Sequence, residues 1–146
     1  METLELKDIA PYLPYGLNVM IWNGDAKPYI REMTELKTYT RYVFASVNSK
    51  PLLRPLSDLM EDEETISTII NESWIAGEYR IIISEVRISI EDEDNDVLSI
   101  WLQKPHCNME WVNDILYANH YDLKFLIEQG LALDLKTIED SKSITE

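Results

Sequence analysis

The sequence has 146 residues, of which 45% are hydrophobic and 10% aromatic, so the chain can bury one core, and disorder throughout is excluded. Its formal net charge of -14 argues against direct nucleic-acid binding, because such binding requires Lys and Arg to displace counterions from phosphates. The single cysteine excludes an intramolecular disulfide, and no apolar run approaches the roughly 20 residues of a membrane span. We expect one domain over residues 1–138, a frayed polar tail over 139–146, and a cytoplasmic location.

The N-terminal part is predicted to be a short helical turn followed by strands. Residues 6–16 contain two prolines, which prevent a long helix. Partial alternation and enrichment in β-branched and aromatic residues predict three strands, over residues 17–22, 29–36 and 38–47. The Asn23-Gly24-Asp25 sequence after the first of them favours a hairpin turn.

The next part is predicted to be a connection followed by a helix. Two prolines over residues 50–59 favour an ordered connection with buried leucines, since proline cannot donate to a strand ladder. A helix is expected over residues 61–74, with Ser57 or Asp58 as its cap. Its apolar positions follow helical spacing at Ile66, Ile69, Ile70 and Trp74.

A hairpin is expected in the second half of the chain. Residues 79–90 alternate as one strand, with Ile82, Ser84, Val86, Ile88 and Ile90 on one face. Residues 91–96 are a polar loop, and residues 97–103 return as an antiparallel strand.

Two helices and a short edge strand are expected near the C-terminus. The first helix covers residues 109–119 with Asn108 as its cap, and the second covers residues 122–129 and ends at Gly130. Residues 131–135 add a short edge. The predicted fold is therefore α+β: an antiparallel sheet of about five strands with two to three helices, the C-terminal pair packed on one face.

Catalytic and metal-binding patterns are weak in this sequence. Cys107 next to His106, with His120 at a distance, is best interpreted as a partly buried structural cysteine, and these residues offer no usual zinc spacing. Asp92, Asp94 and Asp96 match the start of a calcium loop, but Val97 and Gln103 stand where that loop needs glycine and a bidentate glutamate. We therefore expect no cofactor and no metal. The four tryptophans, Trp22, Trp74, Trp101 and Trp111, are interpreted as core residues.

Three segments resemble an uncharacterised protein family encoded largely by phages and other mobile elements of Bacteroidota. They are residues 10–17 (APYLPYGL), residues 50–59 (KPLLRPLSDL) and residues 122–134 (DLKFLIEQGLALD). The resemblance implies a genomic context and carries no activity or site residues. A small acidic protein from such a context looks like an inhibitor of a host nucleic-acid-binding protein, as many anti-CRISPR proteins are.

The acidic residues concentrate in the middle of the chain and are the predicted partner-binding site. Residues 58–96 contain 13 acidic and only 2 basic residues. Such a field attracts a basic surface, and carboxylates can occupy Lys/Arg sites that otherwise hold phosphates. The predicted partner is a basic host protein such as a CRISPR effector. The predicted contact residues are Glu61, Asp62, Glu63, Glu64, Glu91, Asp92, Glu93, Asp94 and Asp96.

Two alternatives remain open. The chain could be a phage accessory or assembly protein that binds through an apolar patch, with the acid serving only solubility. It could also be an enzyme with an unrecognised site, which would require a concave pocket with carboxylates of perturbed pKa.

Overall fold

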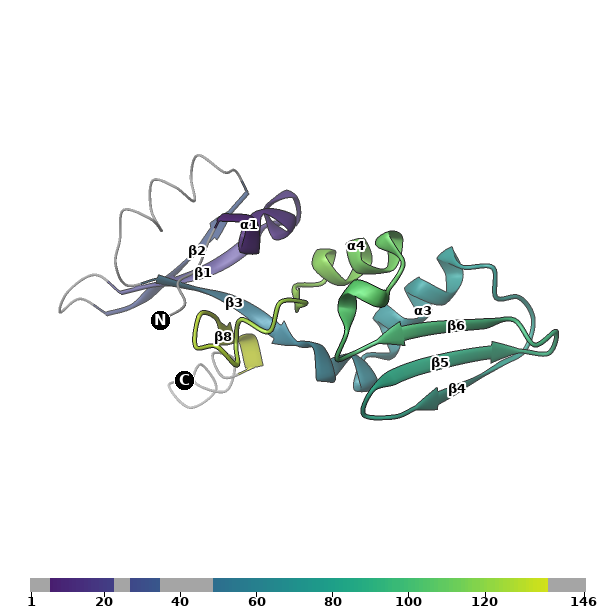
Figure 1. The fold of residues 1–146 in the computed structure, drawn as a ribbon. Helices are drawn as coiled ribbons and strands as arrows, with labels where there is room; N and C mark the ends of the chain where they lie inside the picture. The colour runs from purple at the N-terminus through teal and green to yellow at the C-terminus, as the bar shows by residue number, and fades with distance from the viewer. Residues whose placement is uncertain (1–5, 23–26, 35–48, 137–146) are drawn as a thin grey trace, which may run out of the picture.

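The computed structural model describes residues 6–22, 27–34 and 49–136, and these form two sheets and several helices (Figure 1). The first sheet contains β1 (Leu17–Ile21), β2 (Tyr29–Met33), β3 (Ser49–Pro55), β7 (Tyr121–Asp122) and β8 (Leu133–Asp134). The second contains β4 (Tyr79–Ile83), β5 (Arg87–Asp92) and β6 (Val97–Trp101). The α-helices are α1 (Leu6–Ile9), α3 (Glu63–Glu72) and α4 (Glu110–Ala118), and the 3₁₀ helices are η1 (Ala10–Tyr15), η3 (Leu56–Glu61) and η4 (Pro105–Cys107). The predicted α+β class is confirmed.

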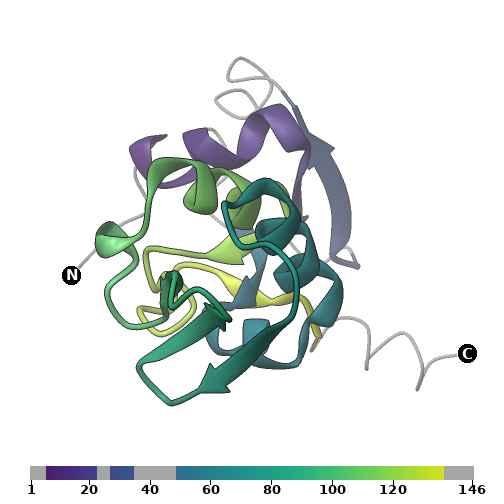
Figure 2. The same cartoon turned by 90° about the vertical axis from the view of Figure 1, so that its right-hand side faces the viewer.

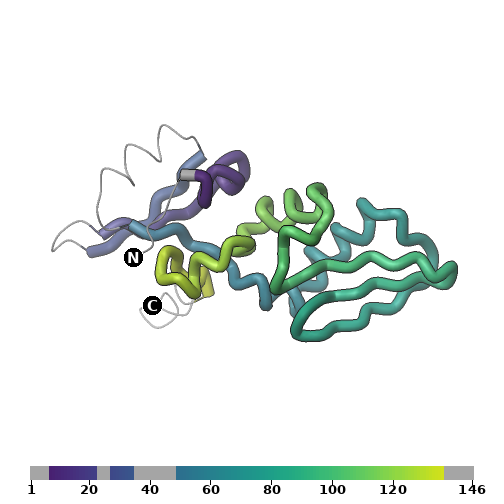
Figure 3. The backbone as a smooth tube through the Cα atoms, viewed as in Figure 1, coloured from purple at the N-terminus to yellow at the C-terminus, as the bar shows by residue number. Residues whose placement is uncertain are grey.

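The two sheets lie at opposite ends of an elongated molecule, and β3 leads from one to the other through η3 (Figure 3). The five-stranded sheet has the order β2-β1-β3-β7, with β8 also paired to β3. It is mixed, because β7 and β8 run parallel to β3 whereas β1 is antiparallel to both β2 and β3. The predicted β1–β2 pairing is thus confirmed. The expected strand over residues 38–47 lies outside the described residues.

The predicted connection over residues 50–59 is wrong in its first half, which is the central strand β3. Each proline lies at a point of β3 where pairing with one neighbouring strand ends. Pro51 is the last β3 residue paired with β1, opposite Val19, and pairing with β8 starts at Leu52. Pro55 is the last residue of the strand, opposite Asp122.

The three-stranded sheet is an antiparallel meander in the order β4-β5-β6. The predicted single strand over residues 79–90 is wrong, because a turn at residues 84–86 divides it. Ser84 makes this turn: its Oγ accepts hydrogen bonds from the N–H groups of Val86 and Arg87, and its own N–H donates to the Arg87 carbonyl. The predicted polar loop between β5 and β6 is confirmed.

Helices α3 and α4 lie on the same side of the three-stranded sheet (Figure 2). Both were predicted, but their caps were not. Asp62 caps α3 by accepting from the Thr65 N–H, in place of Ser57 or Asp58. The cap position of α4 is Met109, and the Asn108 side chain instead bonds the backbone N–H and C=O of Trp101.

The predicted second C-terminal helix over residues 122–129 is wrong, since this segment is a series of turns. The Asp122 carboxylate accepts the N–H groups of Leu126 and Ile127, which competes with helical bonding. Phe125 has φ +55°, a left-handed conformation that stops a right-handed helix. Gly130 has φ +77°, the left-handed conformation predicted for it, although the helix that it was expected to end is absent, and β8 supplies the expected short edge.

Two hydrophobic clusters stabilise the molecule. One lies between the three-stranded sheet and helices α3 and α4, and the other joins α1, η1 and the five-stranded sheet. Tyr117 of α4 packs against both. The tryptophans were wrongly predicted as core: Trp22, Trp101 and Trp111 are half-buried and Trp74 is exposed. Trp111 packs against the first cluster and forms an edge-to-face pair with Trp74, with ring centroids 6.5 Å apart.

Candidate protein-interaction surface

The first acidic cluster, residues 61–64, contains one carboxylate that is used inside the fold. Asp62 Oδ2 accepts from Tyr121 Oη at 2.6 Å and from Arg54 Nη2 at 3.0 Å. Its two oxygens also bind the backbone N–H and the hydroxyl of Thr65. Burial alone would raise the pKa of Asp62, but these hydrogen bonds and Arg54 outweigh it and lower the pKa to about 2. Asp62 therefore joins α3 to the five-stranded sheet, whereas Glu61, Glu63 and Glu64 are exposed.

The second acidic cluster, residues 91–96, is also divided between structural and exposed carboxylates. Asp92 is buried, and its Oδ1 accepts the N–H groups of Asp94 and Asp96 at 3.0 Å. This closes the β5–β6 loop together with Asn95, which has φ +67°. The side chains of Glu93, Asp94 and Asp96 are exposed.

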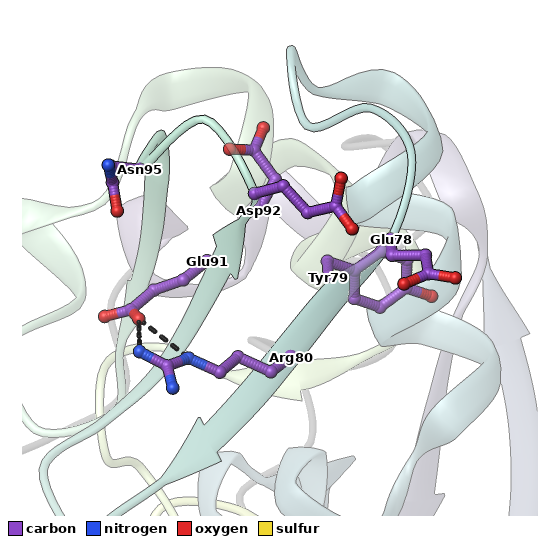
Figure 4. Close-up of a pocket in the computed structure, with 7 residues that line it drawn as sticks. Glu78, Tyr79, Arg80, Glu91, Asp92 and Asn95 are labelled. Carbon is purple, nitrogen blue, oxygen red and sulfur yellow. Dashed lines mark hydrogen bonds and ion pairs between the residues drawn. The ribbon is translucent and has the colours of Figure 1, made fainter.

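The exposed acids of the loop lie next to the start of β4. A shallow pocket of about 330 Å³ is lined by Glu78, Tyr79, Arg80, Glu91, Asp92, Glu93 and Asn95 (Figure 4). Arg80 is the one cation among the described residues that line this pocket, and Figure 4 shows the Arg80 guanidinium on Glu91, with Nη2–Oε2 at 2.7 Å. We call Glu78, Glu91, Glu93, Asp94 and Asp96 the acidic sheet end.

The two predicted clusters do not form one surface. The β5–β6 loop and the N-terminal end of α3 lie toward opposite ends of the three-stranded sheet (Figure 1). Asp62 also binds Arg54 of β3 and Tyr121 of β7, which places the first cluster at the junction with the other sheet.

Strand β4, which the sequence did not single out, is the exposed edge beside the acidic sheet end. The described residues contain no strand on its outer side. Ile81, Ile82 and Ile83 keep 41%, 47% and 48% of their surface exposed, although Ile81 and Ile83 stand opposite the fully buried Ile90 and Ile88. Helices α3 and α4 thus cover β5 and β6 but leave β4 uncovered. The sequence signal is three consecutive isoleucines, which make both faces of the strand apolar.

The backbone register of β4 determines which groups point outward. Ser84 N–H donates to Arg87 O, so this pair is hydrogen bonded. Because hydrogen-bonded and non-bonded pairs alternate in an antiparallel ladder, Ile82 and Arg80 bond to β5. The N–H and C=O groups of Tyr79, Ile81 and Ile83 therefore point away from β5, along the open edge.

The opposite edge of this sheet is partly closed. By the same alternation Trp101 of β6 points its backbone groups outward, and the Asn108 side chain binds both, at 2.6 Å and 3.2 Å. Asn113 in turn accepts from the Asn108 amide. Val97 and Ser99 of β6 also point their backbone groups outward by this alternation, so the Asn108 side chain covers this edge at Trp101.

The candidate catalytic side chains are not assembled into a site. Cys107 is exposed, contrary to the partly buried position expected for it, because it lies in the short surface helix η4 beside the exposed His106. His120 is bound through Nε2 to the Gly16 carbonyl at 2.5 Å. Within the described part of the chain, no group of three or more His, Cys, Asp or Glu side chains is arranged to hold a metal ion.

A second concavity lies where β3 and β8 end. It measures about 540 Å³ and is lined by Arg54, Asp58, Ala118, Asn119, His120, Asp134, Leu135 and Lys136. Burial, together with Asp134, raises the pKa of Asp58. However, His120 and Arg54 are engaged by Gly16 and Asp62, which favours a structural role for these groups.

Residues 10–17, 50–59 and 122–134 come together in the hydrophobic cluster at the five-stranded sheet. Tyr12 donates to the Tyr121 carbonyl at 2.6 Å and accepts the Leu123 N–H at 3.3 Å. Leu53 and Leu126 pack with Tyr12 in the same hydrophobic cluster. The region with excess acid instead forms α3 and most of the three-stranded sheet.

Comparison with protein-family models, with curated proteins and with solved structures finds no match for this chain. No described helix has the length and apolar character that crossing a bilayer would require.

Proposed function

We propose that this protein binds a basic protein of a bacterial host through the three-stranded sheet and inhibits it by covering a groove that otherwise holds nucleic acid. The observation that carries the proposal is the position of the acidic sheet end beside the exposed apolar strand β4. A CRISPR effector is one protein of the required kind, since such effectors hold nucleic acid in a positively charged channel. This is the acidic-inhibitor role expected from composition. The proposed contact surface is now the three-stranded sheet and no longer the full set of nine carboxylates.

The physical basis is charge-assisted hydrogen bonding. Glu93, Asp94 and Asp96 are exposed on a loop whose conformation is fixed by Asp92, so their carboxylates reach Lys or Arg side chains with little loss of loop entropy. Exposed charges also accelerate encounter with an oppositely charged surface. The binding is therefore expected to weaken steeply with added salt.

The accessory or assembly role is the second candidate, and the exposed isoleucines of β4 favour it. In that case binding depends on apolar area and changes little with salt. An enzyme would instead centre on the concavity with Asp58 and Asp134, and the engagement of His120 and Arg54 by the fold makes this the weaker candidate.

The test is affinity capture from nuclease-treated host lysate at low and high salt. The wild type is compared with the variant Glu93→Lys/Asp94→Lys/Asp96→Lys. The control is Glu32→Lys/Glu110→Lys/Glu128→Lys, which makes the same change in net charge at exposed positions outside the β4–β6 sheet. The captured protein is then tested for nucleic-acid binding with and without the chain.

Loss of capture in the loop variant alone, with displacement of nucleic acid by the wild type, supports the proposal. Equal capture by both variants, or capture that persists at high salt, rejects it in favour of the accessory role.

A further inference from the structure

We infer that β4 is a docking edge to which the partner adds one β-strand, apolar at alternate positions and carrying Lys or Arg at both ends. This inference rests on the proposed function and specifies how the basic partner is recognised. Strand addition uses main-chain hydrogen bonds for affinity and alternate side chains for specificity.

The backbone of β4 supplies the hydrogen-bonding groups. Tyr79, Ile81 and Ile83 direct their N–H and C=O groups away from β5, as the Ser84–Arg87 bond and the register require. An antiparallel strand of five to six residues would bond all of them, and the sheet would become four-stranded. Natural edge strands are commonly protected by charged side chains, bulges or proline; β4 contains no proline, and its one charged residue, Arg80, is paired with Glu91 of β5.

The side chains of β4 define what the added strand must carry. Tyr79, Ile81 and Ile83 share the face of the sheet that packs on α3 and α4, so partner residues on this face meet an apolar surface that continues the core. On the other face Ile82 is exposed beside Arg80, which Glu91 already neutralises. Both faces therefore accept apolar side chains.

The ends of β4 are acidic, and this selects the partner. Glu78 directly precedes the strand and Glu85 follows it in the turn, and both are exposed. The acidic sheet end adds Glu93 beside Glu78 in the pocket. A strand with basic residues about seven positions apart would place one at each end.

The same charges argue against a second copy of this chain as the occupant. In an antiparallel pair centred on Ile81, residue 78 stands opposite residue 84 of the other copy, so Glu78 and the other copy's Glu85 become neighbours at both ends of the pair. With a net charge of -14 on each chain, the two copies also repel one another at long range.

The experiment uses a defined probe, a heptapeptide that alternates lysine and valine, and the isotope-labelled full chain observed by NMR. The control peptide has the same composition except that proline replaces the central valine. Wild type is compared with Ile81→Pro, which removes an outward N–H but no hydrogen bond to β5. Ile81→Thr, which keeps the N–H and the β-branched shape, is the matched variant.

We expect the lysine–valine peptide to shift the amide signals of Tyr79, Ile81 and Ile83 and to slow their hydrogen exchange at least tenfold. Ile81→Pro should weaken binding at least tenfold, and Ile81→Thr should weaken it less. Equal binding of both peptides, or shifts located away from β4, would overturn the inference.

A second variant keeps the test decisive if Ile81→Pro does not fold. Glu78→Lys/Glu85→Lys leaves the backbone unchanged, and we expect it to weaken binding of the lysine–valine peptide at least tenfold while the control Glu32→Lys/Glu110→Lys does not. Equal binding by these two variants would overturn the predicted charge selection. Sedimentation is measured in parallel, and a dimer that dissociates in Ile81→Pro would show that a second copy is the occupant.

Failure of the proposed function is distinguishable from failure of this inference. If the peptide binds β4 as expected but no basic host protein is captured, the proposed function is rejected and the docking edge stands. If a basic host protein is captured and Ile81→Pro binds it as well as wild type, only strand addition is rejected.

Discussion

Replacing Asp62 by Asn tests whether this carboxylate holds the two halves of the molecule together. Its side chain is 13% exposed and accepts from Arg54, Tyr121 and both donors of Thr65. The fall in its pKa from 3.8 to about 2 corresponds to about 2 kcal/mol of stability for the charged form. Asparagine also turns an NH₂ group toward donors, so we expect D62N to lose about 3 kcal/mol in total at pH 7.

The pH dependence of the free energy of unfolding separates the contribution of the Asp62 charge from the other contributions of this side chain. Because the folded pKa lies below the unfolded value, the contribution of the charge is fully present above about pH 4 and is lost as the pH falls to about 2. Urea unfolding monitored by tryptophan fluorescence at pH 7 and pH 2 should therefore show a gap between wild type and D62N that shrinks by about 2 kcal/mol in acid.

The control for this measurement is Glu61→Gln, which neutralises an exposed neighbouring acid and should change stability by less than about 0.5 kcal/mol. If D62N is as stable as wild type at pH 7, or if the gap is the same at both pH values, the reasoning is refuted. A stable D62N would also return Asp62 to the set of candidate partner contacts.

Three further predictions concern single side chains. Asn108→Ala leaves the N–H and C=O of Trp101 without their side-chain partner, and urea titration should show a loss of about 2 kcal/mol; a loss below about 0.5 kcal/mol would contradict the bridge. Tyr12→Phe removes the buried donor to the Tyr121 carbonyl and should cost about 1–3 kcal/mol by the same assay, whereas an unchanged midpoint would contradict that bond. Cys107 is exposed, so it should react with a thiol reagent in native protein as fast as in urea; protection of more than about tenfold in the native state would place it in the interior.

The parts of the fold that follow local signals were predictable from sequence. Strand β1 lies where partial alternation predicted a strand, and α3 and α4 have apolar residues at helical spacing that are buried, such as Ile66 and Leu116. Gly130 adopts the positive φ expected of it. In each case the signal and the structure that it specifies lie within a few residues of each other.

The secondary-structure predictions are wrong where the backbone conformation depends on a strand distant in sequence or on a hydrogen bond from a side chain. Strand β3 contains two prolines that are acceptable only because β1, β8 and β7 pair with successive parts of it. The helical pattern of residues 122–129 fails because Asp122 takes the N–H groups that a helix would use. Ser84 breaks an otherwise regular strand by binding two backbone N–H groups of its own turn.

The candidate site was predicted only in part, for a related reason. Composition identified acidic segments but did not separate the carboxylates that bond nearby backbone N–H groups from those that remain exposed, such as Glu93, Asp94 and Asp96. Asp62 and Asp92 are short enough to reach N–H groups two to four residues on, and they became structural. Glu78 and Glu85 were not selected, because they flank a strand whose edge position is known only from the sheet order.

Strand β4 lies outside both described hydrophobic clusters, so substitutions on it are expected to leave the fold intact. Residues 10–17, 50–59 and 122–134 supply Tyr12, Leu53 and Leu126 to the cluster of the five-stranded sheet, and they supply Leu56, Leu59 and Leu123 to the other cluster. Strand β4 belongs to neither buried cluster, so substitutions at Ile81 or Ile83 remove few core contacts. Because distant, independent sites have nearly additive effects on stability, we expect substitutions on β4 to leave the stabilising contacts of Asp62, Tyr121 and Tyr12 unchanged.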